Sequence, residues 1–204
     1  MRPIILASAS PRRAELLSQI GLPFTVAPVD IDETPGADEL PAHYVERLAR
    51  QKAAAGLAHA ASPDSLVLGS DTTVVCDERI LAKPATVEEA AAMLASLSGR
   101  SHRVMTAVAL AGEHGCYARL VITEVRFRNL EEAEILAYCA TGEPMDKAGG
   151  YGIQGRGGLF VAGLWGSYSA VVGLPLEETG QLLAEAGQPV WSYWNRPKET
   201  RRDE

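Results

Sequence analysis

The sequence predicts a mixed fold of the α/β or α+β class, in which strands and helices alternate along the chain. Short apolar runs of strand length alternate with longer segments of helical periodicity, and neither repeats nor low-complexity linkers interrupt them. The chain has 204 residues, of which 47% are hydrophobic. This is enough for one domain of ordinary to large size with a proper core.

The first strand, loop and helix predict a binding site for an anion. Ser10 suits the N-cap position of the helix and Pro11 suits its first turn. Backbone N–H groups and the positive end of the helix dipole meet there, close to Ser8 in the loop and to the guanidinium groups of Arg12 and Arg13. An ordinary capped helix with solvated arginines is the alternative. Cations in a first turn oppose the helix dipole, however, and this favours an anionic ligand, most simply a phosphate.

The remaining elements follow from hydrophobic periodicity, caps and turn residues. The expected strands lie at residues 3–7, 24–28, 66–68 with a resumption at 74–75, 80–81, 104–111, 117–127 and 159–161. The expected helices lie at residues 11–20, 43–61, 86–98, 131–140 and 175–186. An acidic loop with Pro and Gly spans residues 30–41, and the charged residues 196–204 are expected to form a frayed tail.

Composition excludes several classes of protein. The net charge of −7 opposes binding to nucleic acid, because contacts with phosphates require excess positive charge. No apolar stretch is long enough to span a bilayer, and charged residues interrupt the first twenty positions where a signal peptide would be apolar. Cys76, Cys116 and Cys139 show no metal-binding spacing. We therefore expect a reduced, cytoplasmic protein without a structural zinc ion.

Two charged residues lie where the pattern predicts burial. Asp71 interrupts the apolar run at residues 66–75, and a buried carboxylate is unfavourable unless it is paired or bound to a metal. The β-branched residues that follow argue against an ordinary turn at this position. Lys52 shares a helix face with Tyr44 and Leu48. It is either functional or a lysine whose stem packs along the edge of the core while its ammonium group reaches water.

Two further charged residues are weak signals when taken alone. Lys83 precedes Pro84, which favours an extended backbone and directs the lysine away from the following helix. Glu33 lies in the acidic loop. Solvation is the simple alternative for both. Together with the residues above, they supply four cations for a polyphosphate and one or two carboxylates for Mg²⁺. A metal-bridged phosphate chain beside a carboxylate that activates water is typical of phosphoanhydride hydrolysis.

Residues 150–155 match the pattern GxGxxG, but their context does not fit a dinucleotide-binding fingerprint. Such a fingerprint follows a strand and opens a helix, whereas this segment follows a loop and precedes the expected strand at 159–161. The chain also lacks the GxxxxGK[ST] motif of P-loop enzymes. The glycines allow close approach of backbone to a ligand. Gln154 within them offers a donor and an acceptor that match the edge of uracil or thymine.

Taken in order, these segments resemble the Maf proteins, nucleotide pyrophosphatases related in fold to the inosine triphosphatase group. The similarity runs from Leu6 to about Ala186. It is carried by residues 6–13, 47–53, 69–72, 83–84, 97–99, 102–106, 146–155 and 171–176.

The resemblance implies an elongated α/β fold with two lobes, a mixed twisted sheet with flanking helices, and a central cleft. One catalytic domain is expected over residues 1–190, followed by a charged tail over 191–204. The implied reaction converts a nucleoside triphosphate into the monophosphate and diphosphate, with a divalent cation such as Mg²⁺, Mn²⁺ or Co²⁺. A homodimer is expected from the family alone.

The resemblance also implies roles for individual residues. Asp71 is similar to the general base of the family and to a metal contact, and Glu33 is a further acidic group that would join it at the metal. Four residues are similar to the phosphate-binding group, and the two lysines among them are also expected to be catalytic: Ser8, Arg13, Lys52 and Lys83.

Three positions separate two subgroups of the family. The subgroup that acts on dTTP and UTP has Arg, Thr and Gln, which this chain matches with Arg12, Thr72 and Gln154. The subgroup that acts on 7-methyl-GTP has Trp, Gln and Glu. A glutamate suits the N–H-rich edge of a cationic guanine, whereas glutamine suits the acceptor–donor–acceptor edge of uracil. The expected substrates are therefore dTTP, UTP and modified pyrimidine nucleotides, with 7-methyl-GTP as the alternative.

A second class of function stays open. The family was first named for an effect on septum formation, so a nucleotide-binding regulator is the alternative to an enzyme. A regulator needs cations for the phosphates but no carboxylate placed to activate water. Asp71 and Lys83 therefore favour the enzyme. The expected partner is a small nucleotide, without nucleic acid or membrane.

Overall fold

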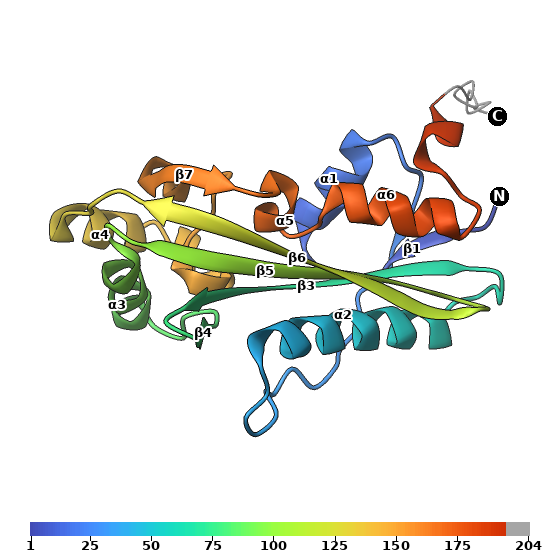
Figure 1. The fold of residues 1–204 in the computed structure, drawn as a ribbon, viewed down its shortest axis with the longest axis horizontal. Coiled ribbons are helices and arrows are strands. Elements are labelled where there is room, and N and C mark those ends of the chain that lie inside the picture. Colours follow the sequence, from blue (N-terminus) through green and yellow to red (C-terminus); the bar gives the residue numbers. More distant parts are fainter. Residues whose placement is uncertain (195–204) are drawn as a thin grey trace, which may run out of the picture.

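The computed structural model describes residues 1–194, which form one seven-stranded mixed sheet with helices on both faces (Figure 1). The strands are β1 (Ile4–Leu6), β2 (Thr25–Val26), β3 (Leu66–Cys76), β4 (Arg79–Leu81), β5 (Ser101–Gly112), β6 (Gly115–Phe127) and β7 (Val161–Trp165). The helices are α1 (Pro11–Gln19), α2 (Pro41–Ala58), α3 (Val87–Leu97), α4 (Glu132–Cys139), α5 (Tyr168–Val172) and α6 (Leu176–Glu185). Short 3₁₀ helices are η1 (Glu143–Asp146), η2 (Ala148–Gly150), η3 (Arg156–Phe160) and η4 (Val190–Tyr193).

The neighbours of β3 change along one of its edges. The strand order is β2-β1-β3-β5-β6-β7, with β4 also paired to β3. β1 and β2 are parallel to their partners, while β4, β5, β6 and β7 are antiparallel. On one edge, β3 pairs with β5 from Val67 to Val75. On the other edge, β1 pairs with β3 as far as Leu68, and β4 pairs with β3 from Val74 to Cys76. Within residues 1–194, no strand therefore pairs with residues 69–73 of β3 on this side, and we call them the open stretch.

Helices cover both faces of the sheet (Figure 1), and three groups of buried apolar side chains hold them there. One face of the central strands packs against α1 and α6 through residues that include Leu6, Leu17, Leu68, Val108 and Leu183. The opposite face packs against α2 through Val45, Ala49, Ala53, Val75 and Ala107 among others. At the far end of the sheet, α3 and α4 pack on a third group that includes Leu94, Leu97, Val104, Phe127 and Ile135.

Most predicted elements are confirmed with small shifts of their ends, and two predictions are wrong. β3 runs without a break through Asp71, although the sequence predicted an interruption between residues 68 and 74. It continues because β5 pairs with it throughout and because Lys52 compensates the charge of Asp71. Residues 159–160 belong to η3 rather than to a strand, so β7 begins only at Val161. The short helix α5 was not predicted; its N-cap Ser167 accepts a hydrogen bond from the N–H of Ala170.

The end of the described chain tests the predicted tail only in part. Residues 190–193 form η4, and Tyr193 is buried in the group that contains α1 and α6. The predicted frayed tail at 196–204 lies outside the described residues, and the division into a domain over 1–190 and a tail stays a prediction. Within the described chain, no helix combines the length and apolar character required to cross a membrane.

The buried His102 links the stability of this fold to pH. His102 in β5 is 3% exposed. Its ring packs edge-on against Phe127 and Tyr151, and its Nε2 lies 2.7 Å from the hydroxyl of Tyr151. Its Nδ1 is buried without a hydrogen-bond partner among the described residues. Burial lowers the pKa of His102 to about 4, so the ring is neutral in the folded protein at neutral pH.

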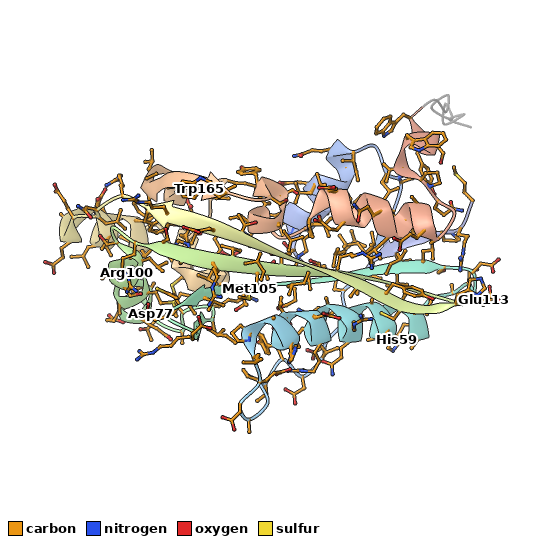
Figure 2. All side chains as sticks on the ribbon, viewed as in Figure 1. His59, Asp77, Arg100, Met105, Glu113 and Trp165 are labelled. Carbon is orange, nitrogen blue, oxygen red and sulfur yellow. The ribbon has the colours of Figure 1, made fainter. Side chains whose placement is uncertain are left out.

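We expect acidification from pH 7.5 to 5 to destabilise the protein by about 2 kcal/mol through His102 alone. An unfolded histidine titrates near pH 6.5, so between there and pH 4 the unfolded chain binds the extra proton and is favoured. Urea unfolding at both pH values measures the difference. His102→Gln should remove this increment, whereas His59→Gln, at the exposed end of α2 (Figure 2), should retain it. An unchanged pH dependence in His102→Gln contradicts the assignment.

Candidate active site

A cavity of about 920 Å³ lies along the open stretch of β3. Its walls come from the loop and first turn of α1, from α2, from the connection after β4, and from the segments around residues 147–155 and 171–173. In open α/β sheets, ligands bind where the neighbours of a strand change direction in this way. The structure brings all the predicted site residues to this one cavity: Ser8, Arg12, Arg13, Glu33, Lys52, Asp71, Thr72, Lys83 and Gln154.

The open stretch lets the cavity reach both faces of the sheet. Successive side chains of a strand point to opposite faces. Asp71 accordingly contacts Lys52 of α2, while the hydroxyl of Thr72 accepts a hydrogen bond from Arg13 of α1 on the other face. Since none of the described strands covers this edge of β3, both neighbours line the same cavity.

Lys52 joins two carboxylates on the α2 side of the cavity. Its Nζ lies 2.7 Å from Oδ1 of Asp71 and 2.6 Å from Oε1 of Glu33. The side chains of Lys52 and Asp71 are each 11% exposed, whereas that of Glu33 is 48% exposed. The cost of burying Asp71 is therefore offset by an ion pair. This outcome favours the functional alternative for Lys52, because its ammonium group turns to the carboxylates instead of reaching water.

The two carboxyl groups differ in their pKa. Burial raises the pKa of Asp71, and the nearby charges of Lys52 and Arg13 reverse this only in part. Burial also acts to raise the pKa of Glu33, but the hydrogen bond and charge of Lys52 lower it further, so that it ends below its ordinary value. A pair of carboxyls whose pKa values are pushed apart is typical of groups with different roles in proton transfer.

Gly69 allows α2 to approach β3 closely enough for this contact. A Cβ atom at Gly69 would lie 2.4 Å from the carbonyl oxygen of Ala49 and 2.5 Å from the backbone nitrogen of Ala53. Lys52 lies between these two alanines in α2, directly above the strand that carries Asp71. The close approach of the helix backbone to the strand thus positions the lysine.

The two arginines of α1 take different partners. Arg13 donates to the carbonyl of Gly173 at 2.8 Å, to Oγ of Ser8 at 3.1 Å and to Oγ1 of Thr72 at 3.4 Å. Arg12 instead pairs with Asp146 at 3.2 Å. Both line the cavity, but in the structure as it stands their guanidinium groups do not share one contact point.

The cap of α1 also differs from the prediction. Ser10 occupies the N-cap position and Pro11 the first turn, as predicted. The side chain of Ser10 makes no capping hydrogen bond, however, and its backbone N–H donates to Oγ of Ser8 at 3.2 Å. The N–H of Ser10 is therefore bound by Ser8. The N–H groups in the first turn of α1 donate no hydrogen bond to the Ser10 side chain, so they are available to an acceptor from outside the helix.

Lys83 and Gln154 lie at exposed positions of the cavity wall. Neither side chain has a hydrogen-bond or ion-pair partner within residues 1–194, so their polar ends are available to a ligand. Lys83 lies in the connection from β4 to α3. Burial acts to raise the pKa of Glu33, and the charge of Lys83 lowers it, as Lys52 does more strongly. Gln154 lies between η2 and η3, among the glycines of the GxGxxG match.

Four residues with charged or hydroxyl groups in the site region were not predicted from the sequence. Glu143, Asp146 and Lys147 line the cavity, and Tyr138 contacts Glu143 through its hydroxyl at 3.0 Å. The lining includes five cationic side chains, namely Arg12, Arg13, Lys52, Lys83 and Lys147, and four carboxylates, namely Glu33, Asp71, Glu143 and Asp146. The cavity is therefore locally positive in a chain of net charge −7.

Comparison with known proteins places the chain in a family. The model of the family described as Maf-like protein matches residues 3–186. A dTTP/UTP pyrophosphatase of Shewanella oneidensis is 59% identical over 191 residues, which cover 90% of this chain and 98% of that protein. Proteins of the same name from Vibrio parahaemolyticus and Xanthomonas oryzae pv. oryzae are each 54% identical, covering 89% and 90% of this chain and 96% and 98% of their own lengths. From the match to the family model and from these relatives, the chain belongs to the Maf family.

Proposed function

We propose that this protein is a nucleoside triphosphate pyrophosphatase that hydrolyses dTTP and UTP to the monophosphate and diphosphate. The observation that carries the proposal is the buried Asp71, held by Lys52 on the wall of a cavity that also contains Arg13 and Lys83. The shared name of the relatives in three bacterial genera supports the same activity.

Cations on three walls of the cavity suit a chain of phosphates. Arg13 and Ser8 lie at the start of α1, where backbone N–H groups and the helix dipole also favour an anion. Lys52 and Lys83 approach from α2 and from the connection after β4. The substrate would therefore lie with its triphosphate between these walls, across the open stretch of β3.

The residues present fit a divalent cation, for which Mg²⁺, Mn²⁺ and Co²⁺ are the candidates. Asp71 and Glu33 already share one positive charge, that of Lys52. Two carboxylates together with phosphate oxygens are a usual arrangement for Mg²⁺. Asp71 and Glu33 would thus hold the ion, which when bound neutralises charge on the phosphates. The described residues contain no cluster of three or more His, Cys, Asp and Glu side chains that would hold a metal without substrate.

Asp71 is the group that would take a proton from the attacking water. It is paired with Lys52, and its raised pKa makes its carboxylate a stronger base than that of an exposed aspartate. The water would attack the α-phosphorus, and diphosphate would leave. Lys52 and Lys83 would stabilise the negative charge that develops on the phosphate oxygens.

The part of the cavity around Gln154 suits a pyrimidine base. The amide of Gln154 offers one donor and one acceptor, which can pair with the neighbouring carbonyl and N3–H of uracil or thymine. Thr72 and Arg12 line the same cavity. Cytosine carries an amino group and an unprotonated N3 at the corresponding atoms, so polar groups of the site would face like groups.

We expect kcat/KM for UTP to exceed that for CTP by roughly tenfold or more, because each unpaired buried polar group costs about 1–3 kcal/mol. Turnover of a panel of triphosphates with Mg²⁺, Mn²⁺ or Co²⁺ measures the preference. Reaction in ¹⁸O-labelled water should place the label in the monophosphate. Release of orthophosphate with a nucleoside diphosphate, or equal turnover of UTP and CTP, would overturn the proposal.

A further inference from the structure

The glycine-rich segment that carries Gln154 is folded around one carboxylate. Oε1 of Glu143 accepts hydrogen bonds from the backbone N–H of Gly157 at 3.2 Å and from the hydroxyl of Tyr138 at 3.0 Å. Oε2 accepts from the backbone N–H of Arg156 at 3.1 Å. The carboxylate thus binds the chain directly after Gln154.

Tyr138 holds the same segment on the other side of Gln154. The backbone N–H of Gly152 donates to the hydroxyl of Tyr138 at 3.2 Å, and this hydroxyl in turn donates to Glu143. The hydroxyl lies in the third core group, where the ring of Tyr138 packs edge-on against Phe160. Gln154 therefore lies between two anchored positions, each two residues away along the chain.

This arrangement accounts for glycines that the dinucleotide pattern left without a role. A Cβ atom at Gly155 would lie 2.2 Å from Oε1 of Glu143, and one at Gly157 would lie 2.8 Å from the hydroxyl of Tyr138. Any side chain at these positions would displace the segment from the groups that bind it. The glycines are needed for close approach to Glu143 and Tyr138, and not for approach to a dinucleotide.

Glu143 is suited to bind backbone N–H groups as an anion. Its side chain is 15% exposed. Burial acts to raise its pKa, but the N–H groups of Gly157 and Arg156 and the hydroxyl of Tyr138 lower the pKa below its ordinary value. The carboxylate is therefore ionised at neutral pH, and each oxygen is an acceptor. The amide of a glutamine at this position would present an NH₂ group to one of the donors.

We propose that Glu143 and Tyr138 are positioning residues for base recognition, which hold residues 152–157 so that Gln154 meets the edge of the pyrimidine. This inference rests on the proposed function. Glu143 makes no contact with substrate in this proposal. Its effect on selectivity is exerted through the backbone on either side of Gln154.

Hydrogen exchange tests, independently of activity, whether Glu143 holds residues 152–157 in place. In Glu143→Gln we expect amide protection of the peptide that covers residues 152–157 to fall at least about tenfold, while protection of β3 and β5 is unchanged. Glu113→Gln is the matched control, because Glu113 lies exposed at the distant β5–β6 turn (Figure 2). Unchanged protection of the segment in Glu143→Gln would overturn the inference.

Kinetics test the consequence for recognition. Glu143→Gln and Tyr138→Phe should each lower the ratio of kcat/KM for UTP to that for CTP by about fivefold or more. Most of this loss should come from a higher KM for UTP, because the groups around Asp71 stay in place. Tyr117→Phe is the control for the tyrosine, since among the described residues the hydroxyl of Tyr117 donates a hydrogen bond only to the nearby carbonyl of His114.

The outcomes separate this inference from the proposed function. If the native protein does not prefer UTP over CTP, the proposed function is wrong. The positioning role is then wrong as well, even if hydrogen exchange shows that Glu143 protects residues 152–157. A native preference that survives in Glu143→Gln but is lost in Gln154→Ala overturns the positioning role alone. If Glu143→Gln does not fold, two other variants decide the question. Tyr138→Phe removes the hydroxyl that contacts Gly152 and Glu143, and Gly155→Ala places a methyl group against the Glu143 carboxylate.

Discussion

Replacement of Asp71 by asparagine is expected to lower kcat by at least about 10²-fold, the usual scale for loss of a positioned general base. Asparagine keeps the shape of the side chain but cannot take a proton at neutral pH. The fold should persist, because Lys52 keeps its contact with Glu33 and a neutral amide is less costly to bury than a carboxylate. Steady-state turnover of UTP, with a thermal melt of the same sample, separates the two effects.

A matched variant and a pH profile sharpen this test. Asp77→Asn makes the same chemical change at an exposed turn beside Arg100 (Figure 2), and it should leave kcat unchanged. In the native protein, kcat/KM should fall on the acid side as Asp71 is protonated. Because its pKa is raised, this limb should lie above the range of an ordinary aspartate. Near-native turnover in Asp71→Asn would move the base elsewhere, with Glu33 the next candidate.

Replacement of Gly69 by alanine should destabilise the protein by about 3 kcal/mol, at the upper end of the range for overpacked cores. The new methyl group would meet backbone atoms of Ala49 and Ala53, which cannot rotate away as a side chain could. For a chain of this size the melting temperature should fall by roughly 10 °C. The displaced helix should also separate Lys52 from Asp71, so activity should fall below what the remaining folded fraction explains.

Gly180→Ala in α6 is the control for this substitution. Beyond its own helix backbone and chain neighbours, a Cβ atom there meets no atom of the described residues within 4 Å. Alanine in a helix interior is also more stable than glycine by about 0.5–1 kcal/mol. The change from glycine to alanine should thus lower the stability of the protein at position 69 and raise it at position 180. Native-like stability and activity of Gly69→Ala would mean that α2 can move away from β3 without consequence for the site.

The sequence predicted most elements of the fold, and it singled out residues that the structure brings to one cavity, because both leave local signals. Apolar periodicity marks β3 and α2 irrespective of their neighbours, and Asp71 is conspicuous within an apolar run. Burial of an unpaired carboxylate is unfavourable, so the apolar run around Asp71 also predicts that this residue has a partner. The break predicted around Asp71 was wrong for a related reason. The partner that stabilises the charge, Lys52, is remote in sequence, and its side chain could not be placed from periodicity.

Features that depend on long-range geometry were not predictable. Alternation along β3 predicts that Asp71 and Thr72 face opposite sides of the sheet, and only the absence of a strand along the open stretch lets both line one cavity. Glu143 gave no signal, since nothing in its neighbourhood distinguishes it from other acidic residues of loops. Its partners become evident only when the backbone of residues 152–157 is seen to turn back on it.

The contacts that shape this turn have a consequence for how the enzyme can diversify. The hydrogen bonds that hold the backbone on either side of Gln154 join residues of the stretch 138–157 to one another. Asp71 and Lys52, in contrast, are positioned by the packing of α2 on β3. A substitution among residues 138–157 can therefore alter what Gln154 contributes to base selection without disturbing the contact between Lys52 and Asp71. A substitution of Thr72 is different, because Thr72 lies next to Asp71 in β3 and contacts Arg13.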